Sequence, residues 1–537
     1  MFRKKRKQTK RLTESFGKLK NESFDFQSIR KYFENKDNSK AFQVLSDKTC
    51  LDLDFEELFM FLDRTTSKIG QQYLYNNLRT IEIDPQKTSV NEEIIQLLSE
   101  DAAFRIKIQS QLERLSKYDV YRISELFQKE HPQPPKWFFV VKLLSFTSLL
   151  SFILMFFSPN FLFLFLGVFA TNFIIHIWNK KNLLSIIDAI PQLLRLNNFA
   201  NYFNSIKELK KLNPNLAGFI KTINRVKYRM SFLKLETKLQ GEFESIAWIF
   251  LELVKIIFLL EPLLLFGVLN RLNTKREEIA NVFEFVGRID MLISIASLRK
   301  GLDNFCIPEI NNTDKKIKAI DIYHPLIINC TTNTLEVSDK SILLTGSNMA
   351  GKTSFIRTIG LNLITGLTIN TCFAKSLIFP VTRIFSAIRI SDDLLNDKSY
   401  YFEEVLTIKE MITESENENI NLFLLDEIYK GTNTIERISA GKAVLSTLAK
   451  NGNIVFVSTH DIELTEMLSE EYELFHFSEI VNEKTVDFDY KLKKGKLKNR
   501  NAIKILQING YPEEVVKEAI VISKELDKIS KTQKEKH

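Results

Sequence analysis

Cysteine and glycine are scarce in this chain of 537 residues. The cysteines are far apart in the sequence and form neither a CxxC pair nor a cluster with histidine, so a zinc site or a disulfide framework is not predicted. They are expected to be small buried side chains in a reducing compartment. Of the 17 glycines, nine follow residue 345, which favours long helices first and tight turns or loops later. The four cysteines are Cys50, Cys306, Cys330 and Cys372.

A surplus of charge is absent outside the N-terminus. The chain carries 74 Lys and Arg against 66 Asp and Glu, and the first forty residues account for the surplus with 13 basic and five acidic side chains. No long apolar run follows them, so a secretory signal is not expected. We predict a basic N-terminal tail over residues 1–45. Its residues 3–7 could bind the phosphates of DNA or of anionic lipid, or remain solvated without a partner.

Long apolar runs are absent except in the middle of the chain. Residues 137–157 contain one charge, Lys142, and residues 161–178 contain none, with Ser-Pro-Asn between the two runs as a turn signal. Both runs reach the ~17–25 residues that a membrane span needs. A tryptophan and nearby lysines stand at each outer end. We therefore predict a transmembrane helical hairpin over residues 137–178, with both outer ends in the cytoplasm and the protein in the cytoplasmic membrane. The alternative is a buried pair of helices in a soluble core.

The rest of the first 310 residues has a helical pattern. Apolar residues recur at intervals of three and four, which predicts a helical core in two parts, residues 46–136 and residues 179–310. A third apolar stretch, residues 246–269, contains two glutamates, a lysine and a proline, so a buried or interfacial helix is expected rather than a third crossing. Residues 89–92, Ser-Val-Asn-Glu, have the capping-box pattern and predict the start of a helix.

A phosphate-binding pattern begins at residue 346. The apolar run 341–345 leads into GSNMAGKT, a complete GxxxxGK[ST] pattern, and an amphipathic run follows. Strand, glycine loop and helix are the context in which backbone N–H groups and a helix N-terminus surround phosphates. Lys352 would neutralise the β and γ phosphates, and the Thr353 hydroxyl would bind Mg²⁺. The predicted nucleotide-binding residues are Gly346, Ser347, Asn348, Met349, Ala350, Gly351, Lys352, Thr353 and Ser354.

Two further strand patterns end in polar residues. The apolar run 421–425 is followed by Asp426 and Glu427. We predict that Asp426 holds Mg²⁺ and that Glu427 activates the attacking water as a general base. The run 453–457 leads into His460, at the end of a strand where parallel sheets bind ligands, so His460 is predicted to sense the γ-phosphate or the water. The predicted catalytic residues are Lys352, Glu427 and His460. The alternative for Asp426 and Glu427 is a pair of exposed acids at the end of a strand, and the alternative for His460 is a surface or capping histidine.

Residues around these motifs carry a family resemblance. Asn-Met lies inside the phosphate loop, SDDLLNDKSYYFEEVLTIKEMI follows it, and Gly-Thr-Asn-Thr occupies 431–434, after Asp-Glu. Downstream come FDYKLKKG and NRNAIKILQINGYP. Together these segments resemble the ATPase domain of the MutS family of DNA mismatch repair proteins. Upstream, residues 62–78 and 284–298 are similar to the start and the later part of the helical core of that family.

The resemblance implies an ABC-like ATPase that uses ATP and Mg²⁺ and forms a homodimer to complete its active sites. Ser399 matches the signature serine that reaches the nucleotide of the opposite subunit, and residues 431–434 match the segment near that interface. An ordinary helix N-cap is the alternative for Ser399. The resemblance also implies DNA as a partner. Too few residues precede the helical core to hold the family's mismatch-reading and connector domains, so mismatch reading itself is not expected.

Two functions are compatible with these features. The first is a MutS-like ATPase that couples ATP hydrolysis at dimeric composite sites to DNA binding. The second is an ATP-driven, membrane-associated switch or scaffold whose partner is a protein or a lipid surface. In both cases the expected fold is an α-helical core or lever domain with a transmembrane helical hairpin. An α/β P-loop ATPase domain with a C-terminal helical extension follows over residues 311–537.

Overall fold

The chain divides into two compact units. The computed structural model describes residues 2–131, 133–231, 242–311, 315–347, 350–389, 400–481, 486–497 and 502–534. Unit 1 comprises Met1–Lys40, Leu62–Arg79 and Asp84–Leu302, and unit 2 comprises Ala41–Phe61, Thr80–Ile83 and Asp303–His537. The unit boundaries differ from the predicted ones because residues 41–61 and 80–83 leave the helical core and belong to unit 2.

Unit 1 is helical throughout its described residues. Its helices are α1 Phe2–Ser15, α2 Phe26–Ile29, α3 Lys31–Glu34, α6 Lys68–Arg79, α7 Pro85–Glu100, α8 Ala102–Leu112, η1 Glu113–Leu115, η2 Tyr118–Ile123, α9 Glu125–Gln128, α10 Phe138–Leu154, α11 Phe161–Asn204, α12 Lys207–Lys210, α13 Leu216–Ser231, α14 Glu242–Phe258, α15 Leu260–Asn273 and α16 Arg276–Gly301.

Close packing of α6 on α16 forms the centre of unit 1. A Cβ atom at Gly70 of α6 would lie 2.3 Å from the carboxylate of Asp290, and one at Gly287 of α16 would lie 2.7 Å from the Cβ of Tyr73. Glycine at these two positions therefore lets the helices approach each other closely. The two helices contain most of the two core-like segments, 62–78 and 284–298, of the sequence resemblance, and the structure packs these segments together.

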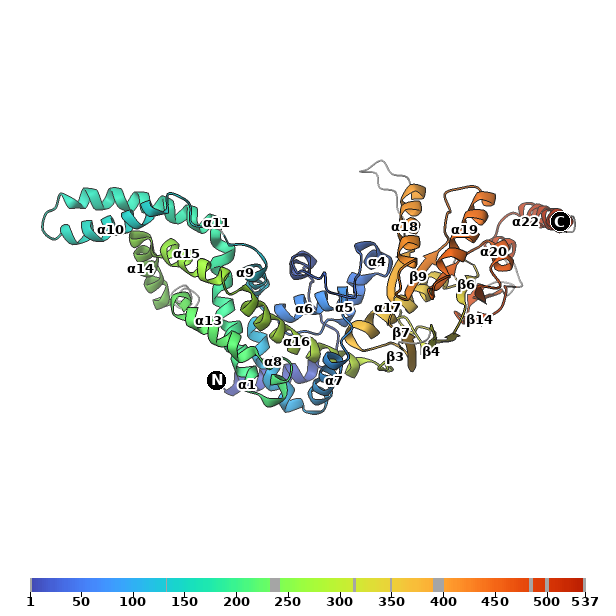
Figure 1. Cartoon of the computed structure of the whole chain (residues 1–537), viewed down its shortest axis with the longest axis horizontal. Helices are drawn as coiled ribbons and strands as arrows, with labels where there is room; N and C mark the ends of the chain where they lie inside the picture. Colours follow the sequence, from blue (N-terminus) through green and yellow to red (C-terminus); the bar gives the residue numbers. More distant parts are fainter. Residues whose placement is uncertain are drawn as a thin grey trace. The chain divides into compact units, whose positions relative to one another are not determined.

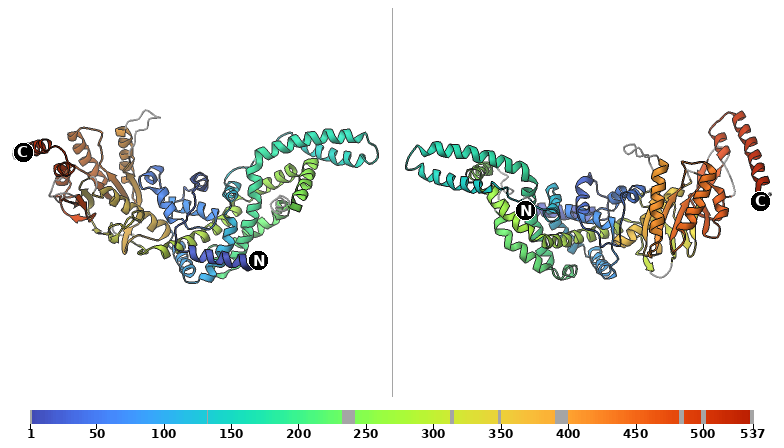
Figure 2. Two further views of the ribbon diagram at one scale, coloured as in Figure 1. Left: turned by 180° about the vertical axis from the view of Figure 1, so that it is seen from behind. Right: turned by 45° about the horizontal axis from the view of Figure 1, so that its top comes forward.

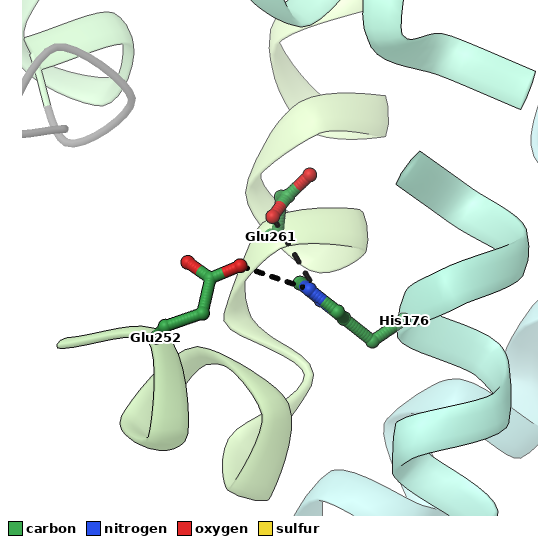
Figure 3. Close-up of side chains that lie close together, drawn as sticks. All are labelled: His176, Glu252 and Glu261. Atoms are coloured by element: carbon green, nitrogen blue, oxygen red, sulfur yellow. Dashed lines mark hydrogen bonds and ion pairs between the residues drawn. The ribbon is translucent and has the colours of Figure 1, made fainter. Parts of the chain in front are cut away.

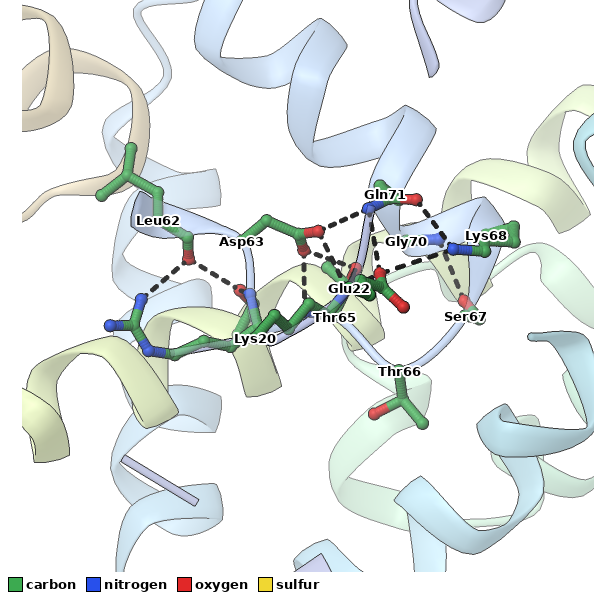
Figure 4. A network of polar contacts seen from close by, with 12 residues as sticks. Lys20, Glu22, Leu62, Asp63, Thr65, Thr66, Ser67, Lys68, Gly70 and Gln71 are labelled. Atoms are coloured by element: carbon green, nitrogen blue, oxygen red, sulfur yellow. Dashed lines mark hydrogen bonds and ion pairs between the residues drawn. The ribbon is translucent and has the colours of Figure 1, made fainter. Parts of the chain in front are cut away.

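The first forty residues pack on unit 1, and this differs from the predicted tail. Figure 4 shows Lys20 beside Asp63, whose buried carboxylate lies 2.9 Å from the Lys20 ammonium and also accepts a hydrogen bond from Gln71. Ile29 and Tyr32 are buried. The prediction of a tail followed the net charge of the segment and overlooked these few apolar side chains. They are enough to hold residues 29–32 against the helical core. Exposed basic side chains of α1 include Arg3, Lys5, Arg6 and Lys7.

Helices α10 and α11 form an antiparallel hairpin, as Figures 1 and 2 show. The predicted turn lies between them, and the rings of Trp137 and Trp178 meet edge to face with their centroids 5.3 Å apart. One described helix, over Phe161–Asn179, is long and apolar enough to cross a membrane, and 17% of that window is buried. Helix α10 has 17 residues, because residues 155–157 leave the predicted run for the turn. The hairpin is thus a structural finding, whereas its crossing of a membrane remains an expectation.

The third apolar stretch is divided into α14 and α15 at Leu259. This residue has φ 46°, in the left-handed region, and so breaks the helix. Carbonyls before the break accept hydrogen bonds from the hairpin: Asn172 donates to Ile257 O and Ser145 to Phe258 O, both at 2.7 Å. The stretch forms two helices of a bundle instead of one.

Unit 2 combines sheets and helices. Its elements are β1 Gln43–Val44, α4 Asp47–Asp52, α5 Phe55–Leu62, β2 Thr80–Ile81, β3 Glu309–Asn311, β4 Ile317–Ile322, β5 Asn333–Val337, β6 Ser341–Thr345, α17 Lys352–Ile369, β7 Ser376–Pro380, β8 Arg383–Ala387, α18 Tyr400–Ser415, β9 Asn421–Asp426, α19 Thr434–Leu448, β10 Ile454–Ser458, α20 Ile462–Met467, β11 Tyr472–His476, β12 Glu479–Val481, β13 Val486–Phe488, β14 Lys493–Lys494, α21 Ala502–Ile508 and α22 Glu513–Lys534.

The main sheet of unit 2 has the order β14-β11-β6-β10-β9-β8. The five strands from β11 to β8 are parallel, and β14 is antiparallel to β11. Strands β6, β9 and β10 read as nearly continuous apolar runs because both faces of the sheet are covered. The second sheet has the order β3-β7-β4-β5. The three predicted strands therefore form, and they are neighbours in the order β6-β10-β9.

Candidate functional site

The carboxyl ends of β6, β10 and β9 bring the predicted site residues to one edge of the sheet. Ser458, the last residue of β10, is in register with Leu344 of β6 and with Asp426 of β9. The phosphate loop follows β6, His460 follows β10 and Glu427 follows β9. Because all three strands are parallel, the loops that follow them meet on the side where α/β sheets bind ligands.

The phosphate loop has the backbone that its glycines allow. Gly346 has φ 148° and Gly351 has φ 99°, and a Cβ at Gly346 would lie 2.7 Å from the Phe477 carbonyl oxygen. Ala350 is buried and donates its N–H to Ser347 O at 3.2 Å. The Ser347 hydroxyl is buried without a hydrogen-bond partner, so it is free to contact a phosphate oxygen. Asn348 and Met349 lie outside the described residues.

Lys352 is the first residue of α17 and is buried. Its ammonium donates hydrogen bonds to the carbonyl oxygens of Gly346 at 2.8 Å and Ser347 at 3.0 Å. Burial lowers the pKa of Lys352, while the carboxylates of Glu427 and Asp426 act to raise it. The Lys352 ammonium thus lies inside the loop, in position to bind phosphate oxygens. A bound phosphate would favour the charged form of the lysine further.

A hydroxyl and a carboxylate meet at the start of α17. Thr353 Oγ1 donates to Asp426 Oδ2 at 2.7 Å, and the Ser458 hydroxyl donates to the other oxygen of Asp426. Oxygen ligands of this kind are those that Mg²⁺ prefers, usually with several retained waters. The residue set therefore fits Mg²⁺. Ser354, next in the first turn of α17, is half-buried.

Glu427 lies beside Asp426 in a strained turn. Its φ of 51° and the φ of 62° at Tyr429 are both in the left-handed region, which costs about 1–3 kcal/mol each and is commonest at functional sites. The N–H of Glu427 donates to Ser458 O at 2.9 Å, and the N–H of Tyr429 donates to the buried carboxylate of Glu404 at 2.6 Å. These bonds hold the turn in the conformation that presents the Glu427 side chain.

The Glu427 carboxylate has two cationic or hydrogen-bonding partners. Its Oε1 lies 2.9 Å from Nε2 of His460 and its Oε2 lies 2.6 Å from the Lys430 ammonium. Burial acts to raise the pKa of Glu427, but the bonds from His460 and Lys430 outweigh it and lower that pKa to about 2. Glu427 is therefore ionised at any physiological pH, as a general base must be.

His460 stands between the lysine and the glutamate. Its Nε2 is 3.2 Å from the Lys352 ammonium and 2.9 Å from Glu427 Oε1. An ammonium can only donate and a carboxylate can only accept, so this nitrogen serves one partner at a time, according to its protonation. The side chain is 42% exposed. This position fits the predicted sensor and gives it two alternative partners.

Residues 431–433 lead into α19, which begins at Thr434. Asn433 is the N-cap, with its side chain accepting from Glu436 N at 3.0 Å, and the Glu436 carboxylate accepts from the Thr432 hydroxyl at 2.7 Å. This is a reciprocal capping arrangement, so the Gly-Thr-Asn-Thr segment has a local structural role. Ser399, its predicted neighbour at the subunit interface, lies outside the described residues.

Several residues that support the site were missed in the sequence. Arg437 and Asp461 form a two-pronged ion pair at 2.6 and 2.9 Å between α19 and the turn after His460. The carboxylate of Asp52 in α4 accepts a hydrogen bond of 2.6 Å from the hydroxyl of Ser386, which lies 334 residues later in the chain. This bond links α4 to the end of β8. No local pattern marks either pair, because each partner is an ordinary polar residue and only the tertiary fold brings it close.

The expected burial of the cysteines is confirmed for two of them: Cys50 and Cys372 are buried, whereas Cys306 and Cys330 are half-buried. The backbones of Cys306 and Cys372 pair in an isolated antiparallel β-bridge, with two hydrogen bonds of 2.9 Å between them. Among the described residues, no disulfide joins any of the four cysteines. The pairing is invisible in the sequence because 66 residues separate the two positions.

Comparison with known proteins gives one family for this region. The family model of MutS domain V matches residues 342–527. The chain is 31% identical over 273 residues to the DNA mismatch repair protein MutS of Petrotoga mobilis, a match that covers 48% of this chain and 33% of that protein. It is 28% identical over 278 residues to the protein of the same name from Thermotoga maritima, over 49% of this chain and 34% of the relative. The DNA mismatch repair protein MSH3 of Kluyveromyces lactis is 29% identical over 276 residues, 48% of this chain and 26% of the relative. The match thus spans about a third or less of the length of these relatives.

Proposed function

We propose that this chain belongs to the MutS family through the region that matches domain V, and that it binds ATP with Mg²⁺ and hydrolyses it at the sheet edge of unit 2. The observation that carries the proposal is the contact of Thr353 with Asp426 at 2.7 Å, with Glu427 next in the chain. The phosphate-loop hydroxyl and the carboxylate at the end of β9 meet without any rearrangement.

Each residue has a defined task in this proposal. Lys352 and the N–H groups of the loop bind the β and γ phosphates, and Thr353 and Asp426 hold Mg²⁺, which supplies charge stabilisation to the transferred phosphoryl group. Glu427 accepts a proton from the attacking water, or orients it, and must first exchange its bond to Lys430 or His460 for that water. His460 moves between Lys352 and Glu427 as the γ-phosphate appears and leaves.

The active unit in this proposal is a homodimer. In the proposed dimer, Ser399 of a second chain reaches the γ-phosphate, as the family resemblance implies. A hydroxyl and loop amides from that chain would complete the charge clamp on the phosphate. Hydrolysis would then be coupled to the association of the two subunits.

DNA is the proposed partner of the dimer. The exposed basic side chains of α1 support it, since Arg and Lys gain affinity for DNA phosphates by releasing counterions. The purified, detergent-solubilised protein should hydrolyse ATP faster with duplex DNA, and its affinity for the duplex should fall as salt rises. A variant with Arg3, Lys5, Arg6 and Lys7 changed to Gln should show a shallower salt dependence.

The same experiment separates DNA from a lipid partner. If homoduplex, mismatched and branched DNA all leave the ATPase rate unchanged, the coupling to DNA is refuted. Stimulation by vesicles that contain phosphatidylserine, with none by DNA, would instead establish the membrane switch as the function. Stimulation by neither would leave ATP hydrolysis without either coupling.

We also propose that the α10–α11 hairpin anchors the protein in the cytoplasmic membrane, with both units on the cytoplasmic side. The outward faces support this, because Phe139, Phe163 and Ile174 are each about two thirds or more exposed. Exposed apolar surface of this extent needs a partner, and lipid is the one that suits helices of this length.

The anchor predicts that high-salt and alkaline washes leave the protein in the membrane pellet. Changing Leu166 and Phe173, two exposed apolar residues near the middle of the Phe161–Asn179 span, to Lys should release it, since each lysine near the middle of a span costs about 2.5–3.5 kcal/mol. Leu19→Lys, an equally exposed leucine in unit 1, is the control and should stay in the pellet. Release of the wild-type protein by salt alone would contradict the anchor.

A further inference from the structure

A polar cluster lies inside the helical bundle of unit 1. Figure 3 shows His176 of α11 between Glu252 of α14 and Glu261 of α15. Each offers one ligand atom, and these atoms lie within 4.8 Å of one another. The break at Leu259 allows two glutamates nine positions apart, on different helices, to face the same histidine. The nucleotide site of unit 2 does not use this cluster.

The bond from His176 to Glu252 fixes the state of the ring. Nε2 of His176 lies 3.1 Å from Oε1 of Glu252. The carboxylate can only accept, so Nε2 carries the hydrogen, and in the neutral ring Nδ1 is left with a lone pair. A carboxylate behind a histidine in this way is the usual arrangement when the other ring nitrogen binds a metal.

Two buried atoms beside Glu261 have no hydrogen-bond partner. One is Nδ1 of His176, whose side chain is 5% exposed, and the other is Oδ1 of Asn179, one turn further along α11 and fully buried. The amide nitrogen of the same Asn179 lies 3.4 Å from Oε1 of Glu261, which places the side chain against the carboxylate. Buried polar atoms are nearly always satisfied, so an unsatisfied imidazole nitrogen that faces the buried Glu261 carboxylate indicates a cation between them.

The separation of His176 from Glu261 favours a shared ion over a direct bond. Nδ1 lies 3.8 Å from Oε2 of Glu261, too far for a hydrogen bond. Bonds of about 2.0–2.2 Å from zinc to nitrogen and to oxygen can span up to about 4.2 Å between the two ligand atoms. An imidazolium would instead draw Glu261 in to roughly 2.7–2.9 Å.

We propose that His176 and Glu261 bind a divalent transition-metal ion, with Glu252 orienting the histidine. One imidazole nitrogen with carboxylate oxygen forms a borderline ligand set, which suits Zn²⁺ or Mn²⁺ better than Mg²⁺ or Ca²⁺, whose sites are built from oxygen. Lys255 lies 3.5 Å from Glu252 and balances that carboxylate, so the ion is paired with Glu261. The ion joins the long helix α11 to the α14–α15 break.

Metal content of the full-length protein tests the site. The protein, purified in detergent without a histidine tag, is stripped with EDTA and titrated with Zn²⁺ alone against a chelating dye, and bound zinc is counted by mass spectrometry. One zinc ion per chain should bind at this site and should persist in millimolar Mg²⁺. Glu261→Gln should lose that ion or bind it at least tenfold more weakly, and Glu252→Gln should weaken it about 10–100-fold through the histidine.

Glu277→Gln, the same change at an exposed glutamate of α16, is the matched control and should bind zinc as the wild type does. Zinc held by the Cys306–Cys372 pair or by the nucleotide site is common to all these proteins and cancels in the comparison. Equal zinc content and affinity in the wild type and Glu261→Gln would overturn the proposal. If Glu261→Gln does not fold, Glu252→Gln decides: zinc should raise its Tm less than that of the wild type, and an equal rise would refute the site.

Discussion

The Glu427→Gln protein should bind ATP with Mg²⁺ as well as the wild type does and hydrolyse it about 10²–10⁴-fold more slowly, because a general base contributes that much to the rate. Glutamine keeps the shape of the side chain and can still contact His460, but it cannot take a proton from water. Phosphate release in a single turnover measures the chemistry, and an equilibrium titration with a fluorescent ATP analogue measures binding.

Two further results define this prediction. Glu463→Gln, at an exposed glutamate of α20 near the same sheet edge, should hydrolyse ATP at the wild-type rate. Bonds to His460 and Lys430 lower the pKa of Glu427, and the carboxylate keeps one of them when it meets the attacking water, so its protonation should reduce the wild-type rate only below the ordinary glutamate range. A Glu427→Gln protein with nearly wild-type turnover would show that another group accepts the proton.

The Lys352→Ala protein should lose roughly 10- to 100-fold in ATP affinity. Its ammonium would form charge-assisted hydrogen bonds to phosphate oxygens, and each such bond is worth about 1.5–3 kcal/mol. The change also removes the positive charge nearest to Glu427 within the phosphate loop. Isothermal titration of the purified protein with ATP and Mg²⁺ measures the loss.

Lys409→Ala, at an exposed lysine of α18, is the control and should bind ATP with unchanged affinity. The Tm of both variants, measured without nucleotide, separates lost binding from lost folding. Unchanged ATP affinity in a folded Lys352→Ala protein would refute the assignment of the phosphate loop.

The centre of the candidate nucleotide site could be predicted because its signals are local. Each of its three strands is a short apolar run, and each delivers its polar residues immediately afterwards, so chain order alone places Lys352, Asp426 and Glu427. What supports them could not be predicted in the same way. Lys430 reaches Glu427 only because the turn between them is left-handed at two residues, and Asp461 reaches Arg437 across two elements.

Helix boundaries and unit boundaries were harder to predict. The capping pattern at residues 89–92 lies inside α7, which begins at Pro85 because Asp84 caps it and proline suits the first turn. The N-terminal forty residues look like a charged tail, yet Lys20 finds a buried carboxylate and Tyr32 a buried position in unit 1. In the first case the cap by Asp84 decides where the helix begins, and not the Ser-Val-Asn-Glu pattern. In the second case the contact with Asp63 holds a segment whose charge alone predicts a tail.

The central claim is that the residues at one edge of the main sheet hydrolyse ATP, and phosphate release by the purified wild-type chain tests it most directly. We predict steady release that requires Mg²⁺, stops when EDTA is added, and is about 10²–10⁴-fold slower in the Glu427→Gln protein under the same conditions. Binding of ATP without any release by the wild type, or equal release by Glu427→Gln, would contradict this claim.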